Sequence, residues 1–317
     1  MTPFVSVIMA AYNAEKHISA SIESVLSQSY ANFELLIVND GSTDKTQSIV
    51  EKFCKRDSRI KLINNDKNFF VIKSRNIGIE KAKGKYIAIL DSDDLALPNR
   101  LEKQIKFLEN NSEVFLIGSS AHIIDETNKI IYDFNATTGY YELKKAIHKN
   151  NLIYHSSIMF RNEKVLYREK MIYSEDYDLI LRLFSEGKKI QNLPDILISY
   201  RQTVGSLSKT KERLIQWLFI NKARKFYQER ILTGKDNYNN FDPNSLINLL
   251  DINYPIDQND LLDAMKICLY RKDRIHLKFL LKKYRKNYSV SIRFILYNLL
   301  SKNKYTFALI STIYSKL

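Results

Sequence analysis

The sequence predicts an α/β protein with a mostly parallel sheet and helices on both faces, followed by an α-helical region. The apolar runs that suggest the first strands lie at 4–10, 33–40, 60–65 and 86–90. They alternate with segments of helical spacing, which is typical of parallel sheets. From about residue 211 onward, only helical periodicity is present. We therefore expect an α/β domain over residues 1–208 and a helical region over 209–317.

The predicted helices of the first 110 residues follow these runs in order. They cover 14–28, 43–56, 71–84 and 98–110. Residues that favour helix ends support the bounds: Thr43 or Asp44 is suited to an N-cap, Gly84 to a C-terminus and Pro98 to a first turn. Ligands of such sheets bind at the carboxyl ends of the strands, so polar residues that follow strands are the candidate site.

The segment from 112 to 200 has a mixed pattern. Strands are predicted near 114–118, 121–125, 129–134, 156–160 and 195–201, with a helix from about 175 to 186. Residues 202–212 form the expected boundary with the helical region.

The net charge of +14 is unevenly distributed. Residues 1–200 hold 27 Lys and Arg against 26 Asp and Glu, whereas residues 201–317 hold 22 against 9. No acidic residue follows Asp273. A basic second part suits a polyanion such as an anionic membrane face or a phosphorylated glycolipid. Nucleic acid is not expected as a partner, because no recognition motif accompanies the charge.

Cysteine content and hydropathy predict a cytoplasmic protein. Cys54 and Cys268 lie far apart and have neither a disulfide framework nor metal-ligand spacing, so a reducing compartment is expected. The apolar start at 4–10 lacks a basic segment before it and is interpreted as a strand. No stretch reaches the roughly 18 apolar residues of a membrane span.

Three carboxylates end the apolar run 86–90, at Asp91, Asp93 and Asp94. Unpaired, they would repel each other, so a cation is expected beside them. An EF-hand is rejected because Leu95 and Ala96 stand where a ligand and a glycine are needed. Mg²⁺ or Mn²⁺ fits, since either takes one or two carboxylates plus substrate phosphates. Helix capping by Asp94 is an alternative, but it does not explain the other two.

Other metal- and phosphate-binding patterns are weaker. Eight glycines include no dinucleotide-binding fingerprint and no P-loop. Phosphatases that begin with a strand and two aspartates are a rival, but their aspartates precede Thr or Val rather than Leu95.

Two further acidic segments are candidates. In 38–46, Asp40 ends a strand before Gly41, which suggests either a plain turn or a carboxylate on the imide N–H of a uracil with Tyr12 stacked on the base. In 173–187, acidic residues open a helix, where they either complement the helix dipole or supply a general base.

These segments together resemble the inverting glycosyltransferases of family 2, which have a GT-A fold. The resemblance covers about residues 4–208 and is carried by "VSVIMAAYNAEKHISASIESVLSQSYANFELLIVNDGSTDKT", "SRNIGIEKAKGKYIAILDSDD", "SEDYDLILRL" and "SYRQTVGSLS". It implies transfer of a sugar from a nucleotide donor, UDP-hexose or UDP-N-acetylhexosamine, to a glycan or glycolipid. Lipooligosaccharide, lipopolysaccharide or capsule synthesis is the expected setting.

The resemblance also implies roles for single residues. It assigns contacts with the nucleotide to Ala11, Tyr12, Asn13, Glu15, Asp40, Arg75, Asp91, Ser92 and Arg201. It assigns Mn²⁺ or Mg²⁺ to Asp93 with Asp91. Asp176 is the expected base, and Glu175 supports it or contacts the acceptor. For Arg75, a structural ion pair with Asp91 or Asp94 is an equal alternative to phosphate contact.

One departure concerns the loop after Tyr200-Arg201. Relatives carry a histidine where this chain has Thr203, while Ser206 and Ser208 match. Arg201 is then the expected diphosphate contact of this loop. His155 is either a structural histidine at a strand edge or an acceptor contact.

The segment 270–317 holds twelve Lys and Arg against one Asp, interleaved with aromatic and aliphatic residues. Basic amphipathic helices of this kind suit an anionic membrane surface, here the inner face of the cytoplasmic membrane. A helical packing domain with a solvated basic face is the plain alternative. A non-catalytic nucleotide-sugar-binding protein and a membrane-associated scaffold remain as alternative functions.

Overall fold

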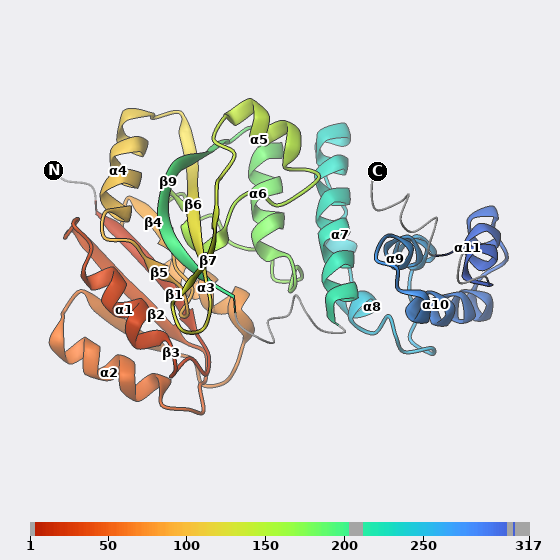
Figure 1. The fold of residues 1–317 in the computed structure, drawn as a ribbon, viewed down its shortest axis with the longest axis horizontal. Helices are drawn as coiled ribbons and strands as arrows, with labels where there is room; N and C mark the ends of the chain where they lie inside the picture. The colour runs from red at the N-terminus through yellow and green to blue at the C-terminus, as the bar shows by residue number, and fades with distance from the viewer. Residues whose placement is uncertain (1–3, 203–211, 303–306, 308–317) are drawn as a thin grey trace. The chain divides into compact units, whose positions relative to one another are not determined.

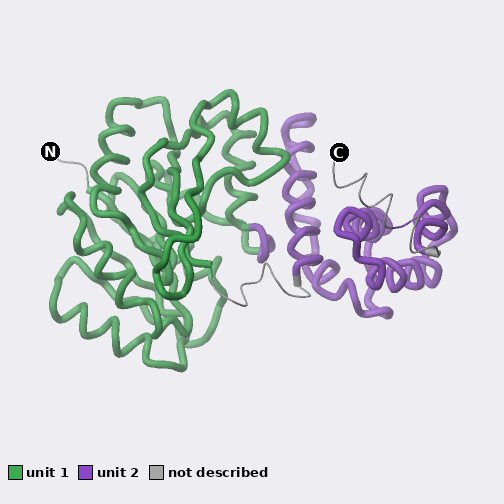
Figure 2. Tube along the Cα trace, in the orientation of Figure 1, with its two compact units in different colours: residues 1–169, 175–204 green, residues 170–174, 205–317 purple. Residues whose placement is uncertain are grey.

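The computed structural model describes residues 4–202, 212–302 and Phe307, and the chain divides into two compact units (Figure 2). The first contains residues 1–169 and 175–204, and the second contains residues 170–174 and 205–317. The expected boundary at 208/209 lies outside the described residues and stays a prediction. Each unit is described by itself.

Unit 1 is built on one sheet with the strand order β3-β2-β1-β4-β8-β6-β9-β5, and β7 pairs with β6 (Figure 1). The strands are β1 (Val5–Ala11), β2 (Phe33–Asn39), β3 (Ile60–Asn64), β4 (Tyr86–Ile89), β5 (Leu95–Ala96), β6 (Val114–Ile124), β7 (Ile130–Phe134), β8 (Met159–Arg161) and β9 (Lys189–Arg201). The first four strands run parallel, and β8 and β7 are antiparallel to their neighbours. The sheet is therefore more mixed than predicted.

Helices cover both faces of this sheet. They are α1 (Ile18–Leu26), α2 (Thr46–Arg56), α3 (Phe70–Lys81), α4 (Arg100–Asn110), α5 (Tyr140–Ala146) and α6 (Glu175–Ser185), with a 3₁₀ turn, η1, at His155–Ser157. Apolar side chains of α1, α2 and α4 share one core with alternate residues of β1, β2 and β4. Gly78 of α3 packs against β1 so closely that a Cβ atom at position 78 would lie 2.5 Å from Ile8 Cγ2. Glycine is therefore needed at this helix–sheet contact.

Several predicted elements differ in their extent. β6 is one strand through 114–124 where two were expected, because it pairs with β9 from Val114 to Ile124 despite shifts in register. β9 starts at Lys189, six residues early, and its pairing with β6 shifts register on the way. The short α5 was not predicted. These differences fall where apolar runs and turn residues do not alternate cleanly.

Unit 2 is helical. Its main elements are α7 (Glu212–Thr233), η3 (Tyr238–Asn240), α8 (Pro243–Ile247), α9 (Gln258–Tyr270), α10 (Arg274–Asn287) and α11 (Ile292–Lys302). Lys283 is fully buried, and its ammonium group donates to the carbonyls of Leu249 (3.0 Å) and Asp251 (2.6 Å). These bonds compensate the burial of the charge.

In the part of the chain that the structure describes, no helix is both long and apolar enough to cross a bilayer. Cys54 and Cys268 are free thiols, as the sequence predicts. The predicted α/β class with a helical C-terminal region is confirmed.

Candidate active site

The carboxyl ends of β1, β2 and β4 lie at one edge of the sheet. Parallel pairing aligns Ala11 with Asn39 and Ile8 with Ile89, so the polar residues that follow each strand emerge together. This is the edge where open α/β sheets bind ligands. The three predicted segments after Ala11, after Asn39 and after Leu90 therefore share one location, as expected.

Asp40 directly follows β2 at this edge of the sheet. It is buried, and its Oδ1 accepts hydrogen bonds from Asn65 Nδ2 (2.8 Å) and from the backbone N–H of Phe69 (2.9 Å). Gly41 follows with a φ of 68°, and a Cβ there would meet the backbone of Lys67 at 2.7 Å. Both donors bind Oδ1, so the carboxylate orientation is fixed before any ligand arrives.

The segment after β1 is tied to the start of α2. Asn13 Oδ1 accepts from the backbone N–H of Thr43 (2.9 Å), and Glu15 Oε2 accepts from that of Lys45 (3.0 Å). Tyr12 makes no such bond in the described structure and is 48% exposed. Asn13 and Glu15 thus bind the loop after β1 to the start of α2, and Tyr12 has an exposed aromatic ring.

The N-cap residue of α2 is Lys45, without a side-chain cap hydrogen bond, and not the predicted Thr43 or Asp44. The helix begins at Thr46, and Asp44 Oδ1 accepts from the Thr46 N–H at 2.9 Å. A second oxygen of Asp44 accepts from the backbone N–H of Glu15. Asp44 therefore serves both the helix start and the loop after β1.

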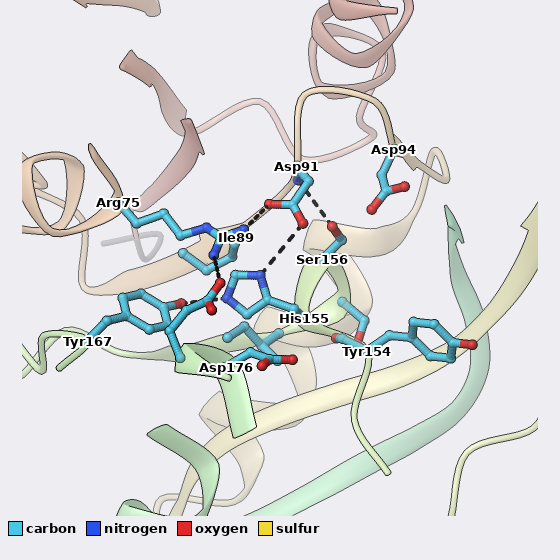
Figure 3. A network of polar contacts seen from close by, with 12 residues as sticks. Arg75, Ile89, Asp91, Asp94, Tyr154, His155, Ser156, Tyr167 and Asp176 are labelled. Atoms are coloured by element: carbon cyan, nitrogen blue, oxygen red, sulfur yellow. Dashed lines mark hydrogen bonds and ion pairs between the residues drawn. The ribbon is translucent and has the colours of Figure 1, made fainter. Parts of the chain in front are cut away.

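Arg75 on α3 joins the two acidic segments (Figure 3). Its Nη2 donates to Asp91 Oδ1 and its Nη1 to Glu175 Oε1, each at 2.7 Å. The Arg75 side chain is 7% exposed. The expected structural ion pair with Asp91 is present, and Glu175, on the first turn of α6, is a partner that the sequence did not predict.

Charges in this network shift the pKa values of its members. Burial alone would raise the pKa of Asp91, but the Arg75 guanidinium and His155 together outweigh burial and lower it. Burial raises the pKa of Glu175 despite the opposing charge of Arg75. Burial, followed by the charge of Asp91, raises the pKa of Asp93 to about 6. The cluster thus holds more negative charge than its own cations neutralise.

Asp94 does not cap the helix after Pro98, which corrects one expectation. α4 starts at Arg100 with Asn99 as the N-cap residue. Asp94 instead lies buried beneath β9, where its Oδ1 accepts the backbone N–H of Arg201 at 2.7 Å. Burial and the charges of its two neighbouring aspartates raise the pKa of Asp94 well above its usual range.

Arg201 is buried, and its guanidinium group donates hydrogen bonds to three oxygen atoms of unit 1. Its Nε donates to the Asp93 carbonyl (2.8 Å), its Nη1 to the Asp125 carbonyl (2.8 Å) and its Nη2 to Asn128 Oδ1 (2.6 Å). These bonds hold the aspartate loop against the turn between β6 and β7. A diphosphate contact by Arg201 stays a prediction, and Thr203, Ser206 and Ser208 lie outside the described residues.

His155 lies in η1, immediately before β8, and faces the same network (Figure 3). Its Nε2 is 2.7 Å from Tyr167 Oη, and its Nδ1 is 3.7 Å from Asp91 Oδ2. The longer distance is an ion-pair separation and not a hydrogen bond. The neighbouring Ser156 Oγ accepts the backbone N–H of Asp91 at 3.1 Å. Ser156 therefore binds the backbone of the aspartate loop, and His155 lies within ion-pair distance of Asp91.

Asp176 follows Glu175 on α6 and is partly buried. Its Oδ2 accepts from Asn151 Nδ2 at 3.0 Å. Asp178, two residues on, is fully buried and bound by Arg168 through Nε at 2.7 Å. Of the acids that open α6, Asp178 is therefore structural, Glu175 is paired with Arg75, and Asp176 keeps a carboxylate without a cationic partner in the described structure.

The residues present fit a divalent ion in part. Among the described residues, no three His, Cys, Asp or Glu side chains form a group able to hold a metal ion by themselves. Mg²⁺ and Mn²⁺ commonly need only one or two carboxylates, because phosphates and water complete the shell. The raised pKa of Asp93 beside Asp91 marks an uncompensated charge that such an ion would neutralise.

Sequence reasoning missed the residues that contact Asp40, Asp176, the backbone of Asp91 and His155. They are Asn65, Phe69, Asn151, Ser156 and Tyr167. Each lies in a loop or turn and contacts its partner across a long sequence separation. Asn65, directly after a strand, was the only one with a local signal, since it occupies the carboxyl end of β3.

Comparison with known proteins agrees with this fold. Residues 6–169 match the model of the family described as glycosyl transferase family 2, and the chain belongs to this family. It is therefore a glycosyltransferase.

Two relatives show the range of this similarity. A glycosyltransferase of Methanocaldococcus jannaschii is 40% identical over 205 residues, which are 63% of this chain and 71% of that protein. The Escherichia coli protein named UDP-Glc:alpha-D-GlcNAc-diphosphoundecaprenol beta-1,3-glucosyltransferase WfgD is 36% identical over 222 residues, which are 67% of this chain and 83% of that protein.

Solved structures confirm the predicted GT-A fold. The crystal structure of S. aureus TarS 1–349 in complex with UDP has a TM-score of 0.59 at 19% identity, covering 95% of this chain and 91% of the other. The mannosyltransferase PcManGT of Pyrobaculum calidifontis, in complex with GDP-Man and Mn²⁺, has a TM-score of 0.55 at 15% identity, covering 99% and 87%. At these identities the likeness concerns the fold.

Proposed function

We propose that this protein is a metal-dependent inverting glycosyltransferase that moves a sugar from a UDP donor to a hydroxyl group of a glycan or lipid-linked acceptor. The observation that carries the proposal is the bridge from Asp91 through Arg75 to Glu175. It joins the candidate donor and metal segment to the residue beside Asp176. A nucleotide-binding edge and a general base are thus held in one network.

Asp40 and Tyr12 are the proposed contacts with the uracil. Asp40 Oδ1 is already engaged by two donors, which leaves Oδ2 for the single imide N–H of that base. Tyr12 is exposed and suited to stack on the ring. Ala11, Asn13, Glu15, Arg75, Asp91, Ser92 and Arg201 are the other proposed nucleotide contacts.

Asp176 is the proposed general base. It accepts the proton of the acceptor hydroxyl, whose oxygen then attacks the anomeric carbon from the face opposite the nucleotide. Asp93, with Asp91, would hold Mn²⁺ or Mg²⁺, and a bound ion supplies charge neutralisation to the departing diphosphate. One displacement inverts the anomeric centre, so an α-linked donor gives a β-linked product. Asn151 orients the base, and Arg75 restrains Glu175 next to it.

A bacterial surface polysaccharide is the proposed product. WfgD is named for a diphosphoundecaprenol-linked acceptor, and another Escherichia coli relative, 30% identical over 237 residues, is named O-antigen biosynthesis glycosyltransferase WbnJ. These names support an acceptor carried on a lipid.

Membrane docking from the cytoplasmic side belongs to the same proposal. Within α11, Ile292, Ile295, Leu296 and Leu299 are between 46% and 86% exposed and recur at the spacing of one helix face. An exposed apolar stripe in a basic segment suits an anionic lipid interface. Binding to phosphatidylglycerol vesicles but not to neutral vesicles is expected, and equal recovery with both would contradict docking.

A donor hydrolysis screen tests the function. Purified protein with Mn²⁺ is offered UDP-Gal, UDP-Glc, UDP-GalNAc, UDP-GlcNAc and the GDP and dTDP sugars. We expect slow release of UDP from one donor and its loss in EDTA. Release that survives EDTA would contradict metal dependence. Absence of both turnover and UDP binding by calorimetry would contradict the donor assignment.

Asp93→Asn is expected to stabilise the metal-free protein at pH 7.5 while abolishing transfer. The raised pKa of Asp93 means that the folded state binds the proton more tightly than the unfolded state. Wild-type stability therefore falls as pH rises from about 4 to about 6, and the amide variant escapes this loss. Thermal melts in EDTA across pH 3.5–7.5 measure the difference.

The metal arm of this experiment adds Mn²⁺ at pH 7.5. Mn²⁺ should raise the thermal stability of the wild type because it neutralises the Asp93 carboxylate. The variant has no carboxylate at this position, so it should gain little. Ser92→Ala, which keeps all three carboxylates, is the matched control and should respond as the wild type does. A variant that is less stable than the wild type at every pH would contradict the assignment of an uncompensated charge to Asp93.

A further inference from the structure

Unit 2 contains a basic pocket that the glycosyltransferase site does not use. It has a volume of about 370 Å³ and is lined by the start of α7, the end of α9 and the start of α10. Arg213, Arg271, Lys272 and His276 line it, with Asp273 as the acidic residue. The sequence showed a basic region here but gave no sign that the cations surround one cavity.

The pocket carries unbalanced positive charge. Both oxygens of Asp273 are engaged by His276: Oδ1 accepts its backbone N–H at 3.0 Å, and Oδ2 lies 2.5 Å from Nδ1. Within residues 4–202 and 212–302, no carboxylate lies in ion-pair contact with Arg213, Arg271 or Lys272. Burial, and after it the charge of Arg213, lowers the pKa of Arg271. Three cations thus share a cavity with one carboxylate that is already occupied.

Lys272 occupies a backbone position that favours glycine. Its φ is 60°, its N–H donates to the Leu269 carbonyl at 3.1 Å, and the next N–H, of Asp273, donates to the Cys268 carbonyl at 2.8 Å. This is a Schellman motif at the end of α9, with lysine at the residue where glycine is usual. Lysine at a position that favours glycine, in a residue that lines a pocket, suggests a role for the lysine side chain.

Arg271 is held in place by aromatic packing. Its guanidinium carbon lies 5.6 Å from the ring centroid of Trp217, which in turn packs against Tyr270 at 6.0 Å. A restrained guanidinium loses little conformational freedom when it binds an anion. Trp217 is the only tryptophan of the chain, so its fluorescence reports on this pocket.

We propose that this pocket binds a phosphate group, with Arg213, Arg271 and Lys272 as its donors. Guanidinium and ammonium groups of residues that line one pocket are suited to phosphate oxygens. A solvated basic face would not need lysine at a residue whose φ favours glycine. The group can belong to a free phosphate or diphosphate or to a lipid headgroup. The proposal does not depend on the proposed transferase activity.

Lys272→Gly tests the pocket without disturbing the fold. Glycine adopts a φ of 60° readily, so the thermal midpoint of the variant should not fall. The full chain is titrated with pyrophosphate in EDTA while Trp217 fluorescence is followed. We expect saturable binding by the wild type and a Kd that is about tenfold higher for the variant, as for loss of one charged hydrogen bond.

Lys282→Gln is the matched control, because this exposed residue of α10 carries the same charge outside the pocket. Its Kd should change less than about twofold, in keeping with a screened surface charge. Equal weakening by both substitutions would overturn the proposal in favour of diffuse charge. Arg271→Gln should weaken pyrophosphate binding as Lys272→Gly does. This comparison requires that the Arg271→Gln variant has the thermal stability of the wild type.

Vesicles separate the two sources of phosphate. The same variants are sedimented with phosphatidylcholine vesicles that contain phosphatidate. If Lys272→Gly weakens vesicle binding far more than Lys282→Gln, the pocket takes a lipid phosphate. If only pyrophosphate distinguishes the variants, the ligand is a soluble phosphate. If neither probe distinguishes them, the pocket is not a phosphate site. None of these readouts uses sugar transfer, so their failure is independent of the proposed function.

Discussion

Replacing Asp176 with asparagine is expected to lower the turnover number at least about 100-fold while donor binding persists. The amide cannot accept the proton of the acceptor hydroxyl, although it keeps the size of the carboxylate. Donor affinity should persist because Asp176 is not among the proposed nucleotide contacts, none of which lies on α6. Turnover is measured with the donor found by hydrolysis, and donor affinity is measured by calorimetry.

Glu186→Gln provides the matched control for this experiment. Glu186 is exposed directly after α6 and has the same charge, so its loss should leave turnover within about twofold. An Asp176→Asn enzyme with normal turnover would show that another group is the base. Loss of donor binding by the same variant would show that Asp176 belongs to the donor site instead.

Arg75→Met is expected to lower the free energy of unfolding of the α/β unit by about 3–5 kcal/mol. The substitution keeps an apolar stem of similar length but leaves Asp91 and Glu175 without the cation that both contact at 2.7 Å. Two partly buried carboxylates, with side chains 28% and 14% exposed, then lose their shared arginine. Urea unfolding followed by circular dichroism measures the change, since the single tryptophan lies in unit 2.

Two comparisons make this second experiment specific. Arg59 binds Asp57 through three hydrogen bonds, but the pair is 31% and 22% exposed, so Arg59→Met should cost about 1 kcal/mol or less. Adding Glu175→Gln to Arg75→Met should restore part of the lost stability by removing one buried charge. Equal losses for the two arginines would contradict the role of burial, and no recovery in the double variant would contradict the role of Glu175.

The sequence was sufficient for the elements that repeat a simple pattern. The four parallel strands of 4–90 and their helices were predicted because buried parallel strands are continuous apolar runs, each followed by a helix. The acidic candidates were also predictable, since carboxylates directly after a buried strand are rarely explained by packing. The irregular segment 112–200 was predicted less well, because its long strands bulge and pair with partners distant in sequence.

The roles of the individual acids could not be separated by sequence. Asp94 and Asp93 are neighbours with the same side chain, yet Asp94 accepts the backbone N–H of Arg201 on β9, while the charge of Asp91 adds to burial in raising the pKa of Asp93. Asp176 and Asp178 differ in the same way, because only Asp178 meets an arginine. Each distinction depends on a partner that lies on another element.

The α/β class, the sheet edge of the candidate site and the acidic residues that gather there follow from the sequence alone. These follow from local periodicity and from residues at strand ends, which act over a few positions of the chain. Only the tertiary structure decided that Arg75 joins Asp91 to Glu175, residues 84 positions apart, and that Lys272 shares a pocket with Arg213. Hydrogen bonds and charge interactions act over a few ångströms in space, and spatial neighbours of this kind are fixed by the packing of whole elements.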